Sequence, residues 1–211
     1  MRVDTPLARD WIGRVAATIA DQTDYLTQLD SAIGDADHGV NMNRGFAAVT
    51  EALRDYEAAT VGDLLIRVGS TLVSRVGGAS GPLYGTAFRA MGKELTLPAV
   101  SGAQLAAALR AGLEALQRLG AAVPGDKTIV DAYVPAIEAL QSALDAGSDL
   151  AAATAAAADA AQEGMKSTVP MQARKGRASY LGPRSVGHQD PGATSTWLIF
   201  RCLGEAVAAG T

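Results

Sequence analysis

Three aspartates lie within eight residues of the sequence, in the stretch LDSAIGDADHG, and no lysine or arginine separates them. Carboxylates this close repel each other unless a cation lies between them. Asp30, Asp35 and Asp37 are therefore candidate metal ligands. Magnesium binds a few carboxylates and completes its shell with water and phosphate oxygens. The spacing favours one or two magnesium ions beside a phosphate group, and a solvated loop with diverging charges is the alternative.

Two other chemistries fit this stretch poorly. A calcium-binding EF-hand loop needs glycine at its sixth position and glutamate at its twelfth. Counted from Asp35, these positions hold Val40 and Phe46. An aspartyl-phosphate nucleophile would follow an apolar strand, and LTQLDSAIG does not have the pattern of one.

The glycine-rich stretch GGASGPLYG, from Gly77 to Gly85, has the composition of a helix start. Ser80 suits a helix cap and Pro82 suits a first turn. The glycines leave backbone N–H groups exposed at a helix N-terminus, which is a ready anion-binding site. A flexible turn with a good cap is the alternative. No Gly-Lys-Ser/Thr sequence follows, so this is not a Walker-type loop.

Two further stretches, PGDKTIVDA and HQDPGATSTW, also have the pattern of helix starts. Asp126 is the predicted cap of the first, and Asp190 caps the second with Pro191 as its first helical residue. Four marked helix starts, near residues 38, 80, 126 and 190, are thus available to face one end of a helical array. His38 and His188 are interpreted as structural hydrogen-bonding residues.

Apolar residues recur at helical spacing through most of the chain, and strand-like alternation is scarce. The pattern predicts one all-α domain over residues 1–211. Caps are predicted at Asp4, Ser101 and Ser148, and Pro135 is expected to kink its helix. Short connections favour antiparallel neighbours. The predicted helices cover residues 5–25, 39–57, 61–75, 81–94, 101–119, 127–145, 148–165 and 192–208.

Two connections are long, at residues 26–38 and 166–191. The first holds the aspartates, and the second is basic. A loop of that length inside a compact domain is usually functional or disordered. The second is interpreted as a cationic flap that closes over phosphates, with a solvated loop as the alternative. Its basic residues are Lys166, Arg174, Lys175, Arg177 and Arg184.

The composition narrows the class of protein. The formal net charge is −4, which argues against a nucleic-acid-binding surface. Cys202 is the single cysteine, so no internal disulfide is available. Neither a signal peptide nor a membrane span is evident, and we expect a cytoplasmic protein.

Four ordered stretches together resemble one family. They are LDSAIGDADHGVNMNRG, GGASGPLYGTAF, PGDKTIVDAYVPAIEAL and ARKGRASYLGPRSVGHQDPGATST. Over essentially its whole length, the chain resembles the nucleotide-binding L subunit of dihydroxyacetone kinases. The resemblance implies an eight-helix antiparallel up-and-down barrel with a nucleotide site at one end.

The resemblance also implies the residues of that site. Asp30, Asp35 and Asp37 would hold two Mg²⁺ ions that bridge the phosphates of ADP or ATP. Together with Arg177 they would form the catalytic set. The residues placed around the nucleotide are His38, Gly39, Val40, Asn41, Ala79, Ser80, Gly120, Ile129, Arg177, Asp190, Pro191 and Gly192.

The resemblance further implies partner subunits. A K subunit would carry dihydroxyacetone covalently on a histidine, and an M subunit of the phosphotransferase system would rephosphorylate bound ADP with phosphate from phosphoenolpyruvate. One alternative is an ATP-dependent kinase subunit for dihydroxyacetone, another ketose or a fatty acid held by a carrier protein. Another is a nucleotide-loaded regulatory module that binds a transcription factor. A homodimer is also left open.

Overall fold

The computed structural model describes residues 1–210, and nearly all of the regular secondary structure within them is helical. A 3-10 helix, η1 (Arg177–Ser185), lies between the last two α-helices. The strands β1 (Val3–Asp4) and β2 (Ala99–Val100) form a short antiparallel pair. The α-helices are α1 (Thr5–Asp21), α2 (Thr23–Ile33), α3 (His38–Leu53), α4 (Val61–Arg75), α5 (Ser80–Glu94), α6 (Gly102–Gly120), α7 (Ile129–Asp145), α8 (Leu150–Ser167) and α9 (Pro191–Ala209).

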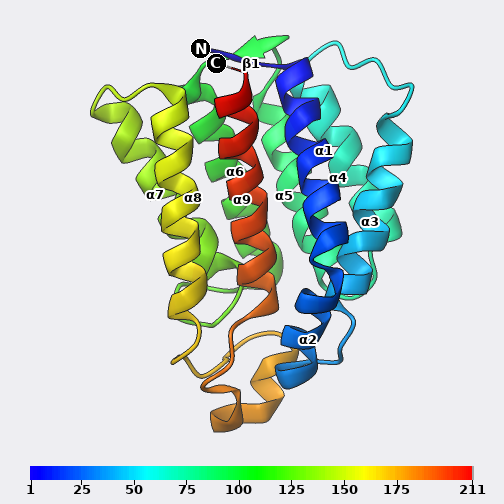
Figure 1. Cartoon of the computed structure of the whole chain (residues 1–211), viewed down its shortest axis with the longest axis vertical. Helices are drawn as coiled ribbons and strands as arrows, with labels where there is room; N and C mark the ends of the chain where they lie inside the picture. The colour runs from blue at the N-terminus through cyan, green and yellow to red at the C-terminus, as the bar shows by residue number, and fades with distance from the viewer. Residues whose placement is uncertain (211) are drawn as a thin grey trace.

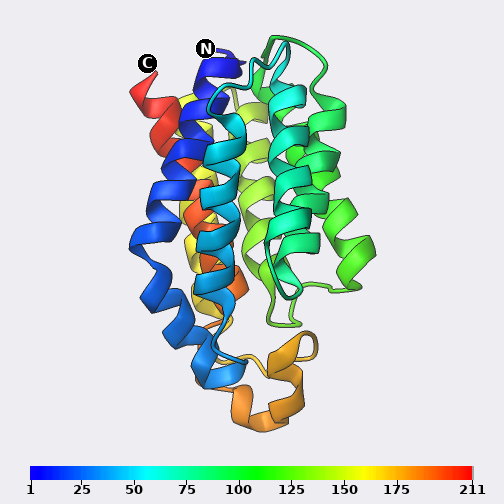
Figure 2. The ribbon, with the colours of Figure 1, turned by 90° about the vertical axis from the view of Figure 1, so that its right-hand side faces the viewer.

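Eight of these helices, α1 and α3–α9, form the antiparallel barrel that the family resemblance implied (Figure 1). Each packs against the next in chain order, and α9 returns to α1, which closes the ring. The chain ends and β1 lie at one end of the barrel, and α2 and η1 project at the other (Figure 2). The helices α3, α5, α7 and α9 begin at this second end (Figures 1 and 2).

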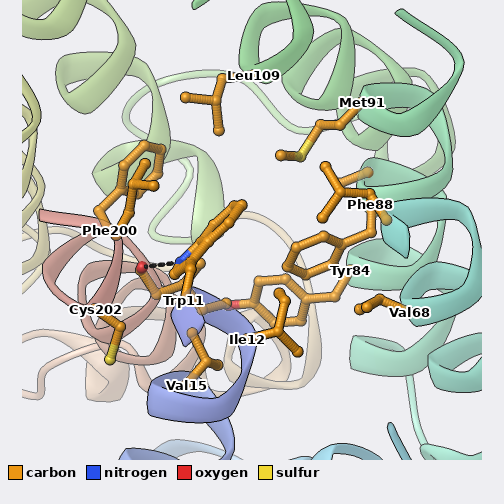
Figure 3. Close-up of a cluster of buried hydrophobic side chains, with 14 of the residues drawn as sticks. Trp11, Ile12, Val15, Val68, Tyr84, Phe88, Met91, Leu109, Phe200 and Cys202 are labelled. Carbon is orange, nitrogen blue, oxygen red and sulfur yellow. Dashed lines mark hydrogen bonds between the residues drawn. The ribbon is translucent and has the colours of Figure 1, made fainter. Parts of the chain in front are cut away.

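Large aromatic side chains fill the interior of the barrel (Figure 3). Trp11 of α1 lies 5.9 Å from Phe88 of α5, measured between ring centroids. Tyr133 of α7 and Phe200 of α9 are 5.1 Å apart in an edge-on arrangement. The Trp11 indole N–H donates to the backbone oxygen of Ile199 at 3.0 Å, so its one polar atom is satisfied inside the core.

Small residues allow the helices to approach closely, as the alanine-rich sequence suggests. A Cβ atom built on Gly69 of α4 would lie 2.5 Å from the backbone oxygen of Gly85 on α5. One on Gly92 would lie 2.6 Å from the oxygen of Gly62. Two glycine pairs therefore allow α4 and α5 to approach to backbone contact over about half of each helix.

Most predicted helix starts are confirmed, although several caps differ. Asp4, Ser101 and Asp190 accept the expected backbone hydrogen bonds at the starts of α1, α6 and α9. Three predicted caps are wrong. Asp149 replaces Ser148 as the cap of α8, and Thr128 replaces Asp126 as the cap of α7. The third, Ser80, is already the first residue of α5 and makes no capping bond.

The two long connections predicted by the sequence are partly helical. The first predicted helix ends at Asp21 rather than at residue 25, and α2 follows almost at once, so Asp30 lies on a helix rather than in a loop. The helix predicted to reach residue 57 ends at Leu53. The basic connection contains η1, whose helical geometry is broken at Gly182.

The described residues 1–210 also test the expectations about a membrane span and about Cys202. Among them, no helix is long and apolar enough to cross a bilayer. Cys202 is buried with its thiol facing the Thr18 hydroxyl at 3.3 Å, as expected for a small core side chain.

Candidate functional site

A cavity of about 570 Å³ opens at the end of the barrel where α3, α5, α7 and α9 begin. The four helix starts that the sequence marks therefore do converge on one place. Backbone N–H groups at helix N-termini favour anions. Twelve of the fifteen predicted site residues line this cavity: Asp30, Asp35, Asp37, His38, Ala79, Ser80, Gly120, Ile129, Arg177, Asp190, Pro191 and Gly192.

Three predicted residues in the first turn of α3 do not line the cavity. Gly39 is buried against α2, where an added Cβ would lie 2.0 Å from the Thr23 backbone oxygen. Val40 is 53% exposed. Asn41 is buried and accepts a hydrogen bond from Arg44 at 2.7 Å. These residues shape the start of α3 rather than the cavity wall.

Asp30, Asp35 and Asp37 form a compact acidic cluster. One carboxylate oxygen of each lies within 4.8 Å of those of the other two. Asp30 comes from the last turn of α2, and the other two come from the link to α3, where Ala36 adopts a positive φ of 59°. This donor set suits a hard cation such as magnesium, which uses few carboxylates and leaves positions for phosphate oxygens.

Backbone donors fix the orientation of Asp30. Its Oδ2 accepts hydrogen bonds from the N–H groups of Asp37 at 2.8 Å and His38 at 3.1 Å. The Asp30 carboxylate thus ties the end of α2 to the beginning of α3. Gly34 lies against the same carboxylate, where a Cβ atom would be 2.0 Å from Oδ1. The local fold therefore requires a residue without a side chain at position 34.

Arg177 reaches the acidic cluster from η1. Its guanidinium group forms an ion pair with Asp35 at 2.9 Å, and both side chains remain partly exposed. An exposed pair of this kind contributes about 0–1 kcal/mol. A small apolar cluster of Ile33, Ala173 and Ala178 packs α2 against this part of the chain. Packing therefore brings Arg177 to the acidic cluster, and its own ion pair is weak enough to exchange for another anion.

His38 is held between two hydroxyl groups, as expected for a structural histidine. Its Nδ1 lies 3.1 Å from Ser80 Oγ and its Nε2 lies 2.9 Å from Ser195 Oγ. Burial lowers the pKa of His38 to about 4, so the ring is neutral near pH 7. Tyr84 extends the network, because its hydroxyl donates to the Gly192 backbone oxygen at 3.0 Å. The network joins the starts of α3, α5 and α9.

Asp190 caps α9 from inside the protein. Its Oδ2 accepts from the Ala193 N–H at 2.7 Å, and its own N–H donates to Thr168 Oγ1 at 3.0 Å. Burial raises the pKa of Asp190 to about 7, although the bond from Ala193 and the charge of Lys127 oppose this shift. The group thus binds a proton more tightly in the folded than in the unfolded chain.

The raised pKa of Asp190 gives a pH-dependent stability. The contribution of Asp190 to the free energy of unfolding is fully present below about pH 4, the pKa of this group in the unfolded chain. It is lost as the pH rises to about 7, its pKa in the folded chain. Inside this window the free energy of unfolding falls by at most about 1.4 kcal/mol per pH unit from this group. We expect Asp190→Asn, which keeps the cap acceptor, to flatten that part of the profile. Urea unfolding of the parent and of Asp190→Asn between pH 4 and 8 measures the free energy of unfolding at each pH. The same pH dependence in both proteins would contradict the prediction.

Sequence reasoning missed a buried charged residue of the cavity wall. Lys127 is only 1% exposed and adopts a positive φ of 62°. Its amino group donates to the backbone oxygens of Met171 and Ser185. The stretch PGDKTIVDA indicates only an ordinary helix start, and nothing in it marks Lys127 as a buried residue. Gly77, Gly78 and Lys175 also line the cavity, in keeping with the glycine-rich stretch and the basic connection that the sequence marks, whereas the sequence does not single out Thr128.

Comparison with known proteins gives the family. The model of the DAK2 domain matches residues 32–205. The chain belongs to the DAK2 domain family. The match covers the acidic link, the helix starts around the cavity and the basic connection. Together with the two relatives described next, it confirms the resemblance to the L subunits of dihydroxyacetone kinases.

Two curated DAK2 relatives match nearly from end to end. The chain is 45% identical over 195 residues to the ADP-binding subunit of the PEP-dependent dihydroxyacetone kinase of Escherichia coli, covering 92% of this chain and 93% of that one. It is 39% identical over 208 residues to the ADP-binding subunit of the PTS-dependent dihydroxyacetone kinase of Lactococcus lactis, covering 99% and 100%.

A solved structure shares the DAK2 fold. It is the dihydroxyacetone kinase from C. freundii in complex with AMP-PNP and Mg²⁺, with a TM-score of 0.74 and 26% sequence identity. The match covers 97% of this chain and 34% of that one. The present chain therefore corresponds to about a third of a longer kinase chain.

Proposed function

We propose that this chain is the ADP-binding, phosphoryl-transferring subunit of a multi-chain dihydroxyacetone kinase. Phosphate would pass from a phosphotransferase M subunit to the bound ADP, and from the resulting ATP to dihydroxyacetone held on a K subunit. The single observation that carries the proposal is the convergence of the Asp30, Asp35 and Asp37 cluster with four helix N-termini on one cavity. The names and lengths of the two subunit relatives support it.

The residues have distinct tasks in this proposal. Asp30, Asp35 and Asp37 would hold two Mg²⁺ ions. Bound magnesium neutralises the charge on the β- and γ-phosphates during transfer. Asp30 is already oriented by two backbone donors, so little reorganisation is needed for binding. Arg177 would exchange its exposed ion pair with Asp35 for one with a phosphate group, which carries more negative charge than a carboxylate.

The helix N-termini supply fixed electrostatics. The residues Ser80, Ile129 and Pro191 begin α5, α7 and α9 beside the cavity. Their oriented backbone dipoles favour negative charge and need no rearrangement when phosphate arrives. The neutral ring of His38 joins two of these starts through Ser80 and Ser195 without adding a charge to the site.

Reconstitution tests this function. With a K subunit and dihydroxyacetone present, we expect product only when an M subunit and phosphoenolpyruvate are also supplied, because the bound nucleotide must be rephosphorylated in place. Dihydroxyacetone phosphate formation is measured with a coupled dehydrogenase assay. Full activity with ATP and the K subunit alone would instead establish the ATP-dependent alternative.

A further inference from the structure

Lys127 lies at the base of a projecting basic segment. We define the basic lobe as residues 172–184, which carry Arg174, Lys175, Arg177 and Arg184 between α8 and α9. The residue before the lobe is Met171 and the residue after it is Ser185. The Lys127 amino group donates to the backbone oxygens of both, at 3.0 Å and 2.6 Å. One side chain thus binds the two ends of the lobe to the start of α7.

Other hydrogen bonds close the same neck. The Ala173 N–H donates to Ser185 Oγ at 2.9 Å, and this bond joins the segment that enters the lobe directly to the segment that leaves it. The Arg174 N–H donates to the Asp126 backbone oxygen at 3.1 Å, next to Lys127 in sequence. All of these contacts lie at the neck, whereas the outer part of the lobe reaches the acidic cluster through Arg177.

A lysine at this buried position is costly. Its 1% exposure removes the amino group from water, and burial lowers its pKa. Helix starts and core packing do not require a buried amino group there, since an apolar side chain of similar volume fills such a space at lower cost. Beyond its charge, which acts on Asp190, the lysine contributes two hydrogen bonds to carbonyl oxygens, and both lie at the ends of the lobe.

We infer that Lys127 is a positioning residue, which clamps the neck of the basic lobe and thereby holds Arg177 over the metal-binding aspartates. This inference rests on the proposed function for the role of Arg177. Because the clamp already restricts the motion of the lobe, Arg177 loses less conformational entropy when it binds phosphate. Lys127 thereby raises nucleotide affinity without contacting the phosphates. Lys127 and Arg177 should therefore be energetically coupled although they are not in contact.

The first test uses no nucleotide. Lys127→Met keeps the length of the side chain and removes its donors. We expect an arginine-specific protease to cut the variant at Arg174, Arg177 and Arg184 at least tenfold faster than the parent, with cutting at the exposed Arg54 unchanged. Lys127→Arg should restore most of the protection, and Lys93→Met, on the exposed end of α5, should behave as the parent. Parent-like lobe cleavage in Lys127→Met would overturn the clamp.

Ser185→Ala keeps the inference testable if Lys127→Met does not fold. This substitution removes the hydrogen bonds that the Ser185 hydroxyl accepts from Ala173 and donates to Gly182, and it leaves Lys127 in place. Faster cutting confined to the lobe supports the clamped neck, and unchanged cutting overturns it.

A double-mutant cycle on Mg-ADP binding then tests positioning against a merely structural role. We expect Arg177→Met to weaken Mg-ADP binding at least tenfold in the parent and less than threefold in the Lys127→Met background, because Arg177 is already misplaced there. Equal losses in both backgrounds would overturn the inference. Absence of Mg-ADP binding by the parent would instead refute the proposed function, which the nucleotide-free cleavage test does not depend on.

Discussion

Asp35→Asn is expected to abolish phosphoryl transfer and to weaken magnesium-dependent ADP binding about ten- to a hundredfold. The substitution removes one of three converging carboxylates and leaves the shape of the link unchanged. Charge-assisted contacts contribute roughly 1.5–3 kcal/mol, and 1.4 kcal/mol corresponds to a factor of ten. Titration calorimetry with ADP, with and without magnesium, measures the loss.

The fold should survive this change. Asp35 is exposed, and its one ion pair, with Arg177, contributes little to stability. Asp159→Asn, on the exposed face of α8, is a matched control that should bind Mg-ADP as the parent does. Parent-like binding by Asp35→Asn would show that the acidic cluster does not hold the metal.

Gly34→Ala is expected to disable the same site from a neighbouring position. The added Cβ would lie 2.0 Å from Asp30 Oδ1, a distance that no side chain tolerates. Two backbone N–H groups hold the other oxygen of this carboxylate, so it moves only by giving up those bonds. We expect magnesium-dependent ADP affinity to fall at least tenfold, again by calorimetry, with helical circular dichroism retained.

A second glycine provides the control for this substitution. Gly13 on α1 has nothing within 4 Å of an added Cβ, so Gly13→Ala should leave nucleotide binding unchanged. If Gly34→Ala bound Mg-ADP like Gly13→Ala, the tight contact at Asp30 would have no role in metal binding.

The helical fold and the convergence of helix starts were predictable because their signals are local. A cap such as Asp190 bonds to a residue three positions away, and Pro191 follows it directly. The helix α2 was missed for a reason connected with function. Its buried face is formed by Leu26, Asp30 and Ile33, so a candidate metal ligand occupies a position where the helical pattern requires an apolar residue.

The role of Lys127 was not predictable from local sequence. Its two acceptors lie 44 and 58 residues further along the chain, and both are backbone oxygens, which any residue type provides. The sequence also does not indicate that Val40 is exposed, since only the packing of α3 against α2 decides which side of the first turn faces the cavity.

The nucleotide content of the purified protein tests the central claim, that ADP is a resident cofactor, most directly. Two metal ions, several helix N-termini and a basic lobe would act on the same phosphates, and such a set favours slow release. Protein purified without added nucleotide should yield close to one equivalent of ADP per chain when denatured and analysed by chromatography. Recovery of an empty protein that phosphorylates dihydroxyacetone with the K subunit and ATP alone would contradict the account.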